Sequence, residues 1–151
     1  MTPTTTERSA HRAAVERLTK ELARSKPDGW RVRVQLPIAL TNSVPEPDAF
    51  VLRGDEYLFD SWHPNAADFG IVIEVSDSTL ELDRAGKGRI YARAGIPVYW
   101  IVNVADKQVD VYTDPDASGY KTRTDYAPGA AVPITLDGAA LGTIPVNELV
   151  P

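Results

Sequence analysis

A single glutamate interrupts the most apolar strand-like stretch of this sequence, residues 69–79 (FGIVIEVSDST). A glutamate side chain is rarely buried unless another group compensates its charge. Glu74 also lies near the carboxyl end of this stretch, which is where open α/β sheets place their ligand-binding crevices. Glu74 is therefore a candidate site residue, and its partner must come from another part of the chain.

Two other residues could complete a site around Glu74. Asp48 opens the preceding strand-like segment, 48–52, and a hairpin-like pairing of the two strands would bring both carboxylates together. Adjacent carboxylates raise each other's pKa unless a cation lies between them, and a divalent metal ion would be such a cation. Lys87 follows in the next predicted helix, from which it could pair with Glu74 or orient a metal-bound water. The alternative is a structural ion pair between Glu74 and an arginine.

The composition restricts which metal such a site could hold. The chain has no cysteine and only two histidines, His11 and His63, which we expect to be surface residues. Disulfides, thiolate nucleophiles and cysteine-based zinc sites are therefore excluded. The remaining ligands are oxygen atoms, which suit Mg²⁺ or Mn²⁺.

The periodicity of apolar residues predicts the elements that would position these side chains. Strands are predicted at 30–38, 48–52, 69–75, 98–104 and 107–113, and helices at 9–25 and 78–94. In the first strand, alternation places one set of side chains inward and the other outward. The inward set is Val32, Val34, Leu36 and Ile38, and the outward set is Arg31, Arg33 and Gln35.

The second helix decides the fold class. Ser78 and Glu81 form a capping box at its start, and Gly95 and Pro97 end it. Because it connects two apolar strands, it implies a right-handed parallel crossover. The other short connections imply antiparallel hairpins, so we expect an α/β fold with a mixed sheet flanked by helices. Segments 131–136 and 141–149 could be edge strands or a last helical turn.

The net charge and the chain length indicate how this protein could bind nucleic acid and how many domains it has. The net charge of -5 disfavours indiscriminate binding to nucleic acid. Residues 1–34 nevertheless carry eight Lys/Arg against four Asp/Glu, a possible phosphate-facing surface. The first eight residues lack any apolar period, so we expect a flexible terminus at 1–8 and a single domain at 9–151. No membrane-span run or signal-peptide core is evident, so we expect a soluble, cytoplasmic protein.

Three segments together resemble a known family: EPD at 46–48, IVIEVSDST at 71–79 and DRAGKGRIYARAGIPVYWIV at 83–102. They are similar to the Uma branch of putative restriction endonucleases, within the PD-(D/E)XK nuclease superfamily. The resemblance implies a restriction endonuclease-like central mixed sheet with a metal site at one sheet edge. It implies that Asp48 is the aspartate of the PD motif and that Glu74 is the acid of the (D/E)XK motif.

The chain departs from the superfamily motif at one position. Ser76 stands where the motif's lysine would be, and the resemblance makes Lys87 the replacement. The implied activity is metal-assisted hydrolysis of phosphodiester bonds, with DNA as the expected substrate and a homodimer as the expected assembly. Asp48, Glu74 and the backbone carbonyl of Val75 would hold Mg²⁺ or Mn²⁺, and Lys87 would act on the attacking water or the transition state.

Basic residues near Lys87 could bind the substrate, and two other functions are compatible with the sequence. The basic run Arg84, Lys87, Arg89 and Arg93 could contact the nucleic-acid backbone. The displaced lysine and the acidic pI of about 5.0 favour an alternative function, a nuclease-fold binding or regulatory module with weak or no catalysis. A structural α/β domain in which Glu74 forms only an ion pair is the third possibility.

Overall fold

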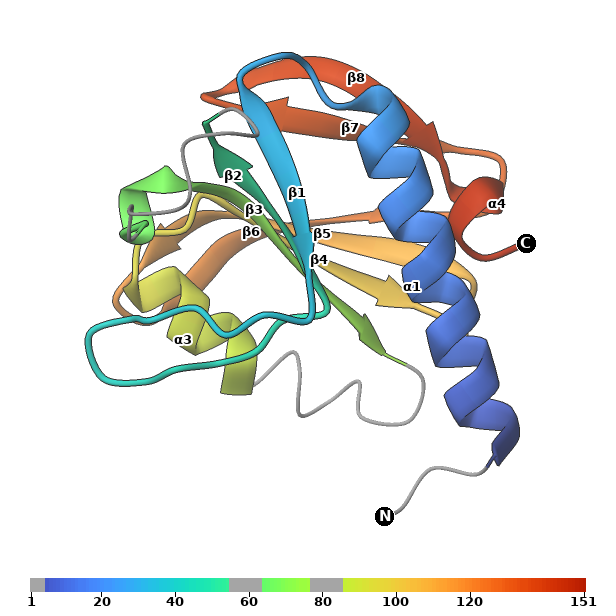
Figure 1. The fold of residues 1–151 in the computed structure, drawn as a ribbon, viewed down its shortest axis with the longest axis horizontal. Coiled ribbons are helices and arrows are strands. Elements are labelled where there is room, and N and C mark those ends of the chain that lie inside the picture. Colours follow the sequence, from blue (N-terminus) through green and yellow to red (C-terminus); the bar gives the residue numbers. More distant parts are fainter. Residues whose placement is uncertain (1–4, 55–63, 77–85) are drawn as a thin grey trace.

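The computed structural model describes residues 5–54, 64–76 and 86–151, and Figure 1 shows their arrangement. Six strands form one sheet in the order β1-β2-β3-β4-β5-β6, and two more form the hairpin β7-β8. The strands are β1 Trp30–Val34, β2 Ala49–Arg53, β3 Phe69–Ser76, β4 Val98–Asn103, β5 Gln108–Asp116, β6 Gly119–Tyr126, β7 Ala131–Leu136 and β8 Ala139–Pro145. The helical elements are α1 Thr5–Ser25, the 3-10 turn η1 Ala66–Asp68, α3 Gly88–Arg93 and α4 Val146–Leu149.

The six-stranded sheet is mixed, which confirms the α/β fold class. Strands β3 and β4 are parallel, with Ile71 opposite Val98, and the other neighbouring pairs are antiparallel. Helix α3 lies in the connection between the two parallel strands, as the crossover requires. The predicted capping box, Ser78 and Glu81, lies outside the described residues.

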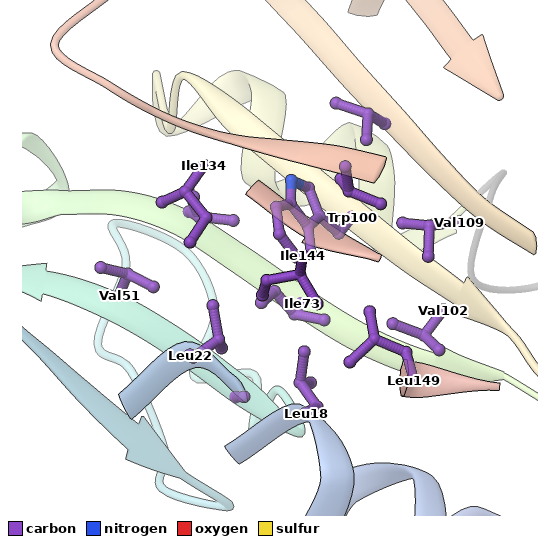
Figure 2. Packing of buried hydrophobic residues seen from close by; sticks show 14 of the residues in the cluster. Leu18, Leu22, Val51, Ile73, Trp100, Val102, Val109, Ile134, Ile144 and Leu149 are labelled. Carbon is purple, nitrogen blue, oxygen red and sulfur yellow. The ribbon is translucent and has the colours of Figure 1, made fainter. Parts of the chain in front are cut away.

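One face of the sheet carries the larger hydrophobic core, which Figure 2 shows from close by. Leu18 and Leu22 of α1 pack there against Ile73 and Trp100 of the central strands, together with the β7-β8 hairpin and α4. Gly70 permits this packing, because a Cβ atom at Gly70 would lie 2.5 Å from the side chain of Leu136. Helix α1 begins at Thr5, whereas the apolar pattern placed its start at Ser9.

The opposite face carries a second hydrophobic cluster. Its buried members include Phe50 of β2, Val72 of β3, Tyr99 of β4 and Tyr91 of α3. Both faces of the central strands are therefore covered, as expected for parallel strands. The solvent-facing position that the sequence pattern gave Arg31 is wrong, because Arg31 is only 1 % exposed.

The first strand is shorter than its apolar alternation predicted. Strand β1 ends at Val34, and Gln35 adopts φ 50, a left-handed conformation that ends the extended backbone. Beyond this turn the alternation no longer refers to one sheet. Leu36 is 45 % exposed, and Ile38 packs in the second cluster instead of beside Val34.

The C-terminal part contains one strand that sequence analysis did not predict. Strand β6 is mostly polar and exposed, so it lacks the apolar alternation of a half-buried strand, yet it pairs with β5 along its length. Segment 131–136, expected as either an edge strand or a helical turn, is a strand. Segment 141–149 is divided between β8 and α4. Among the described helices, none is long and apolar enough to cross a membrane.

Candidate active site

Asp48 and Glu74 lie at the same end of two adjacent strands. The antiparallel register pairs Ala49 with Ile73. Asp48 precedes Ala49 and Glu74 follows Ile73, so Asp48 and Glu74 lie opposite each other at the same end of β2 and β3. The Oδ2 atom of Asp48 accepts a 2.7 Å hydrogen bond from the backbone N–H of Val75. The structure thus brings together the three residues that sequence analysis assigned to a metal.

Glu74 is buried, and two groups from the α3 region hold its carboxylate. Its side chain is only 3 % exposed, and the Nζ atom of Lys87 lies 3.4 Å from its Oε2 atom. The hydroxyl group of Tyr91 donates a 2.8 Å hydrogen bond to the same oxygen. Lys87 itself is 40 % exposed, so its ammonium group contacts both the buried carboxylate and solvent. The lysine from the crossover therefore does reach back to Glu74.

Tyr91 is a site residue that sequence analysis did not name. It is fully buried in the second cluster and packs on Tyr99 with ring centroids 5.2 Å apart, so it has a packing role. Its hydroxyl group contributes to the site as well, because it donates to Glu74. The signal available in the sequence was its spacing, because a residue four positions after Lys87 shares that residue's helix face.

Replacing Tyr91 with phenylalanine should lower the free energy of unfolding by about 1.5 to 3 kcal/mol, because the hydroxyl group donates to a charged acceptor. Urea denaturation of the metal-free protein measures this. Tyr120→Phe is the matched control, since the Tyr120 hydroxyl group donates to the neutral carbonyl of Ile96 at 2.7 Å and should cost only about 0.5 to 1.5 kcal/mol. Equal losses in the two variants would mean that Glu74 accepts this bond as an uncharged group.

His11 is the second site residue that sequence analysis missed. Its Nε2 atom lies 3.3 Å from the Oδ1 atom of Asp48, and its side chain is 29 % exposed, so it is less exposed than expected and it contacts the site. The physical reason is that the amino-terminal part of α1 lies beside the end of β3. His11 precedes Leu18 by seven residues, which places it on the apolar face of the helix, and this spacing was the available signal. His63 lies outside the described residues.

The donor set fits a hard divalent cation. Asp48 and Glu74 offer carboxylate oxygens on neighbouring strands, and Mg²⁺ typically uses one or two carboxylates together with waters and substrate phosphates. In the described parts of the chain, no group of three or more His, Asp or Glu side chains is close enough to hold a metal. The described residues therefore supply part of a coordination shell.

Ser76 occupies the position that the superfamily motif gives to lysine. It lies two residues after Glu74, so the two side chains share one face of β3. Ser76 is completely buried, and its hydroxyl group has no hydrogen-bond partner among the described residues. Ser76 carries no charge, and the ammonium group that contacts Glu74 comes from Lys87 instead.

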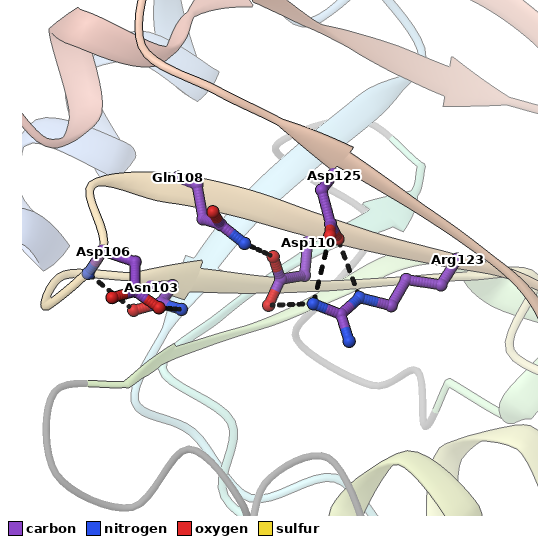
Figure 3. A network of polar contacts seen from close by, with 6 residues as sticks. All are labelled: Asn103, Asp106, Gln108, Asp110, Arg123 and Asp125. Atoms are coloured by element: carbon purple, nitrogen blue, oxygen red, sulfur yellow. Dashed lines mark hydrogen bonds and ion pairs between the residues drawn. The ribbon is translucent and has the colours of Figure 1, made fainter.

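A second buried acid, Asp110, lies on the same face of the sheet. The register places Glu74 opposite Ile101 and Ile101 opposite Asp110, so Asp110 is two strands away from Glu74. Figure 3 shows that its charge is compensated locally: Gln108 donates a 2.6 Å hydrogen bond, and Arg123 lies 3.7 Å away. Asp110 thus belongs to a structural network between β5 and β6.

Comparisons with known proteins identify a nuclease-like family and a similar solved structure. A family model described as "Uma2: Putative restriction endonuclease" matches residues 1–142. A crystal structure described as a putative nuclease belonging to DUF820 from Anabaena variabilis ATCC 29413 superposes with a TM-score of 0.72. The two chains are 16% identical, and the match covers 99% of this chain and 82% of the other, which shows a shared fold. No curated protein matches the chain.

Proposed function

This chain belongs to the Uma2 family of putative restriction endonucleases, and from that premise we propose that it hydrolyses phosphodiester bonds of DNA with the help of Mg²⁺ or Mn²⁺. The observation that carries the proposal is the convergence of Asp48, Glu74 and Lys87 at one end of β2 and β3. The lysine that is missing from its usual position is replaced by one that lies 3.4 Å from the buried acid.

Asp48, Glu74 and the backbone carbonyl of Val75 are the residues that would hold the metal ion. The N–H group of Val75 points to Asp48, and in an extended strand the carbonyl of the same residue faces the same neighbouring strand. The carbonyl oxygen of Val75 is therefore on the side of Asp48. A bound Mg²⁺ or Mn²⁺ would supply a water of lowered pKa and would neutralise negative charge on the attacked phosphate.

Lys87 has the position of a group that acts on the phosphate. Its side chain is 40 % exposed while its ammonium group contacts the buried carboxylate, so that group can also donate to a phosphate oxygen that enters from solvent. A fixed positive charge at this place stabilises the extra negative charge of the transition state. Tyr91 contacts Glu74 and His11 contacts Asp48, so we assign both as positioning residues that act through these carboxylates.

The basic run around α3 supports a nucleic-acid substrate only in part. Arg89 is exposed, so it can contact the backbone of a nucleic acid. Arg93 instead donates a 3.1 Å hydrogen bond from Nε to the carbonyl of Ala117, which ties α3 to the β5-β6 turn. Arg84 lies outside the described residues. We include a homodimer in the proposal because cutting both strands of a duplex takes two sites.

Purified protein should cleave supercoiled plasmid or single-stranded DNA in the presence of Mg²⁺ or Mn²⁺ and should lose this activity in EDTA. Agarose gels over a series of metal concentrations measure the cleavage, and circular dichroism confirms that the protein remains folded in EDTA. Intact DNA under all metal conditions, with the protein folded, would contradict the nuclease proposal. Retention of metal binding in that case would favour a binding or regulatory module with a nuclease fold.

A further inference from the structure

The solvent-facing side of α1 carries a concentration of positive charge. We call its members the α1 basic ridge, and they are the exposed residues Arg12, Arg17, Lys20 and Arg24. Glu16 is the single exposed acid in this described stretch of helix. Arg24 lies 3.5 Å from Glu21, which is buried, whereas the other three form no ion pair with any described residue.

Helix stability explains the ridge only in part, because Glu16 lies four residues from Arg12 and from Lys20, and such opposite-charge pairs favour the helix. Arg17 and Lys20 are three residues apart, and Lys20 and Arg24 are four apart, so like charges are neighbours on the helix surface. Each such pair destabilises a helix by roughly 0.2 to 0.5 kcal/mol. The rest of the chain has the opposite sign, because residues 35–151 carry eight Lys/Arg against seventeen Asp/Glu. Residues 5–25 carry five Lys/Arg against three Asp/Glu, so positive charge exceeds negative charge on this helix of an acidic protein.

The ridge begins beside the candidate active site. Arg12 follows His11, whose Nε2 atom lies 3.3 Å from Asp48, and α1 then runs along one side of the molecule (Figure 1). From Arg12 to Arg24 the helix rises by about 18 Å. B-DNA presents about ten phosphates over that length, both strands counted. The ridge therefore has the length and the sign of charge to follow a nucleic-acid backbone that leads to Asp48.

The other face of α1 decides between nucleic acid and an anionic membrane as the partner. Amphipathic helices bind membranes by inserting their apolar face. In α1 that face is buried in the protein core, where Leu18 and Leu22 are completely covered. Only the charged face is available, and a purely electrostatic contact with phosphates is the type of contact that nucleic-acid backbones receive.

We propose that the α1 basic ridge binds the sugar-phosphate backbone of the nucleic-acid substrate and directs it to the site at Asp48 and Glu74. This proposal depends on the proposed nuclease function for its substrate class. Backbone contacts by lysine and arginine contribute affinity without reading the sequence. Binding should therefore depend strongly on salt and weakly on DNA sequence.

The test measures binding in the absence of cleavage. Fluorescence anisotropy with a labelled 20-base-pair duplex, in EDTA, gives the affinity over a series of salt concentrations. The variant Arg17→Gln/Lys20→Gln/Arg24→Gln should reduce the slope of log K against log [salt] by about 2 to 3, because each phosphate contact contributes about 0.9. The matched pair of single variants is Lys20→Gln and Lys121→Gln, since Lys121 is an exposed lysine on β6. Lys20→Gln should reduce the slope by about 1, and Lys121→Gln should leave it unchanged.

Each outcome decides the proposal. A wild-type slope in the triple variant would overturn it, as would an equal loss in Lys121→Gln or the absence of any binding of DNA by the wild-type protein. Binding to vesicles of anionic phospholipid without binding to DNA would also overturn it. The nuclease function fails separately: if the wild-type protein binds DNA through the ridge but never cleaves it with Mn²⁺, the ridge proposal holds and the nuclease proposal does not.

Discussion

Glu74→Gln should lower DNA cleavage by about 10³-fold or more and should weaken the binding of Mn²⁺ strongly. Glutamine has nearly the same shape as glutamate, but it lacks the charge that makes a carboxylate a ligand for a hard divalent cation. Without a positioned metal ion, both the activated water and the neutralisation of the phosphate are lost. Titration calorimetry with Mn²⁺ and a plasmid-nicking assay measure the two effects.

The same variant should change the folding stability little. The glutamine side chain can still accept the hydrogen bond from Tyr91, which is 2.8 Å long in the wild-type protein. Lys87 loses its partner, but a side chain that is 40 % exposed can be solvated by water. Removing one member of an ion pair is costly chiefly when the remaining charge is buried, and here the remaining charge is not.

Glu148→Gln is the control for this experiment, because Glu148 is an exposed acid on α4. It should bind Mn²⁺ and cleave DNA like the wild-type protein. A Glu74→Gln protein that still binds Mn²⁺ and cleaves DNA normally would contradict the assignment of Glu74 as a metal ligand. A large loss of stability without any change in metal affinity would instead indicate that Glu74 serves only a structural ion pair.

Lys87→Met should separate catalysis from metal binding. Methionine keeps much of the unbranched stem and removes the ammonium group, so the charge that acts on the transition state is lost. We expect cleavage to fall by about 10²- to 10³-fold. The affinity for Mn²⁺ should be kept or should rise, because the ammonium group 3.4 Å from Glu74 no longer competes with the metal ion for that carboxylate.

Thermal unfolding with and without Mn²⁺ adds a second test of Lys87→Met. Without metal, Glu74 keeps its burial and loses its nearest cation, so the variant should be less stable than the wild-type protein. Mn²⁺ should restore at least as much stability to the variant as to the wild type, because the stabilisation by a bound ligand grows with the logarithm of its affinity. Lys121→Met is the control. If Lys87→Met weakened Mn²⁺ binding and cleavage equally, Lys87 would organise the metal site and would not act on the phosphate.

The sequence predicted the central strands and the placement of Asp48 and Glu74 on adjacent strands because both depend on local patterns. Continuous apolar runs at 69–75 and 98–104 indicate buried strands whatever surrounds them, and the structure has β3 and β4 there. Asp48 and Glu74 could be placed at one end of adjacent strands from alternation and strand order alone. The reach of Lys87 could be proposed because a crossover helix must pass near the strand that it leaves.

The sequence predictions failed where the outcome depends on contacts between distant parts of the chain. The apolar alternation at 30–38 continues past Val34, but the left-handed turn at Gln35 gives Leu36 and Ile38 different surroundings. Strand β6 shows no apolar alternation, because its side chains are mostly exposed and its pairing with β5 is made by backbone groups. Backbone pairing of this kind does not require particular side chains, so residue types alone do not predict the strand.

The sequence by itself determined the chemistry that is available: two carboxylates and a lysine, no thiol, and an excess of positive charge within residues 1–34. Only the tertiary structure decided which groups meet. It placed His11 beside Asp48 and the hydroxyl group of Tyr91 on Glu74, although 37 residues separate the first pair and 17 the second. The physical reason is that residue types and their spacing are local properties, whereas compensation of a buried charge depends on whichever helix packs over the strand.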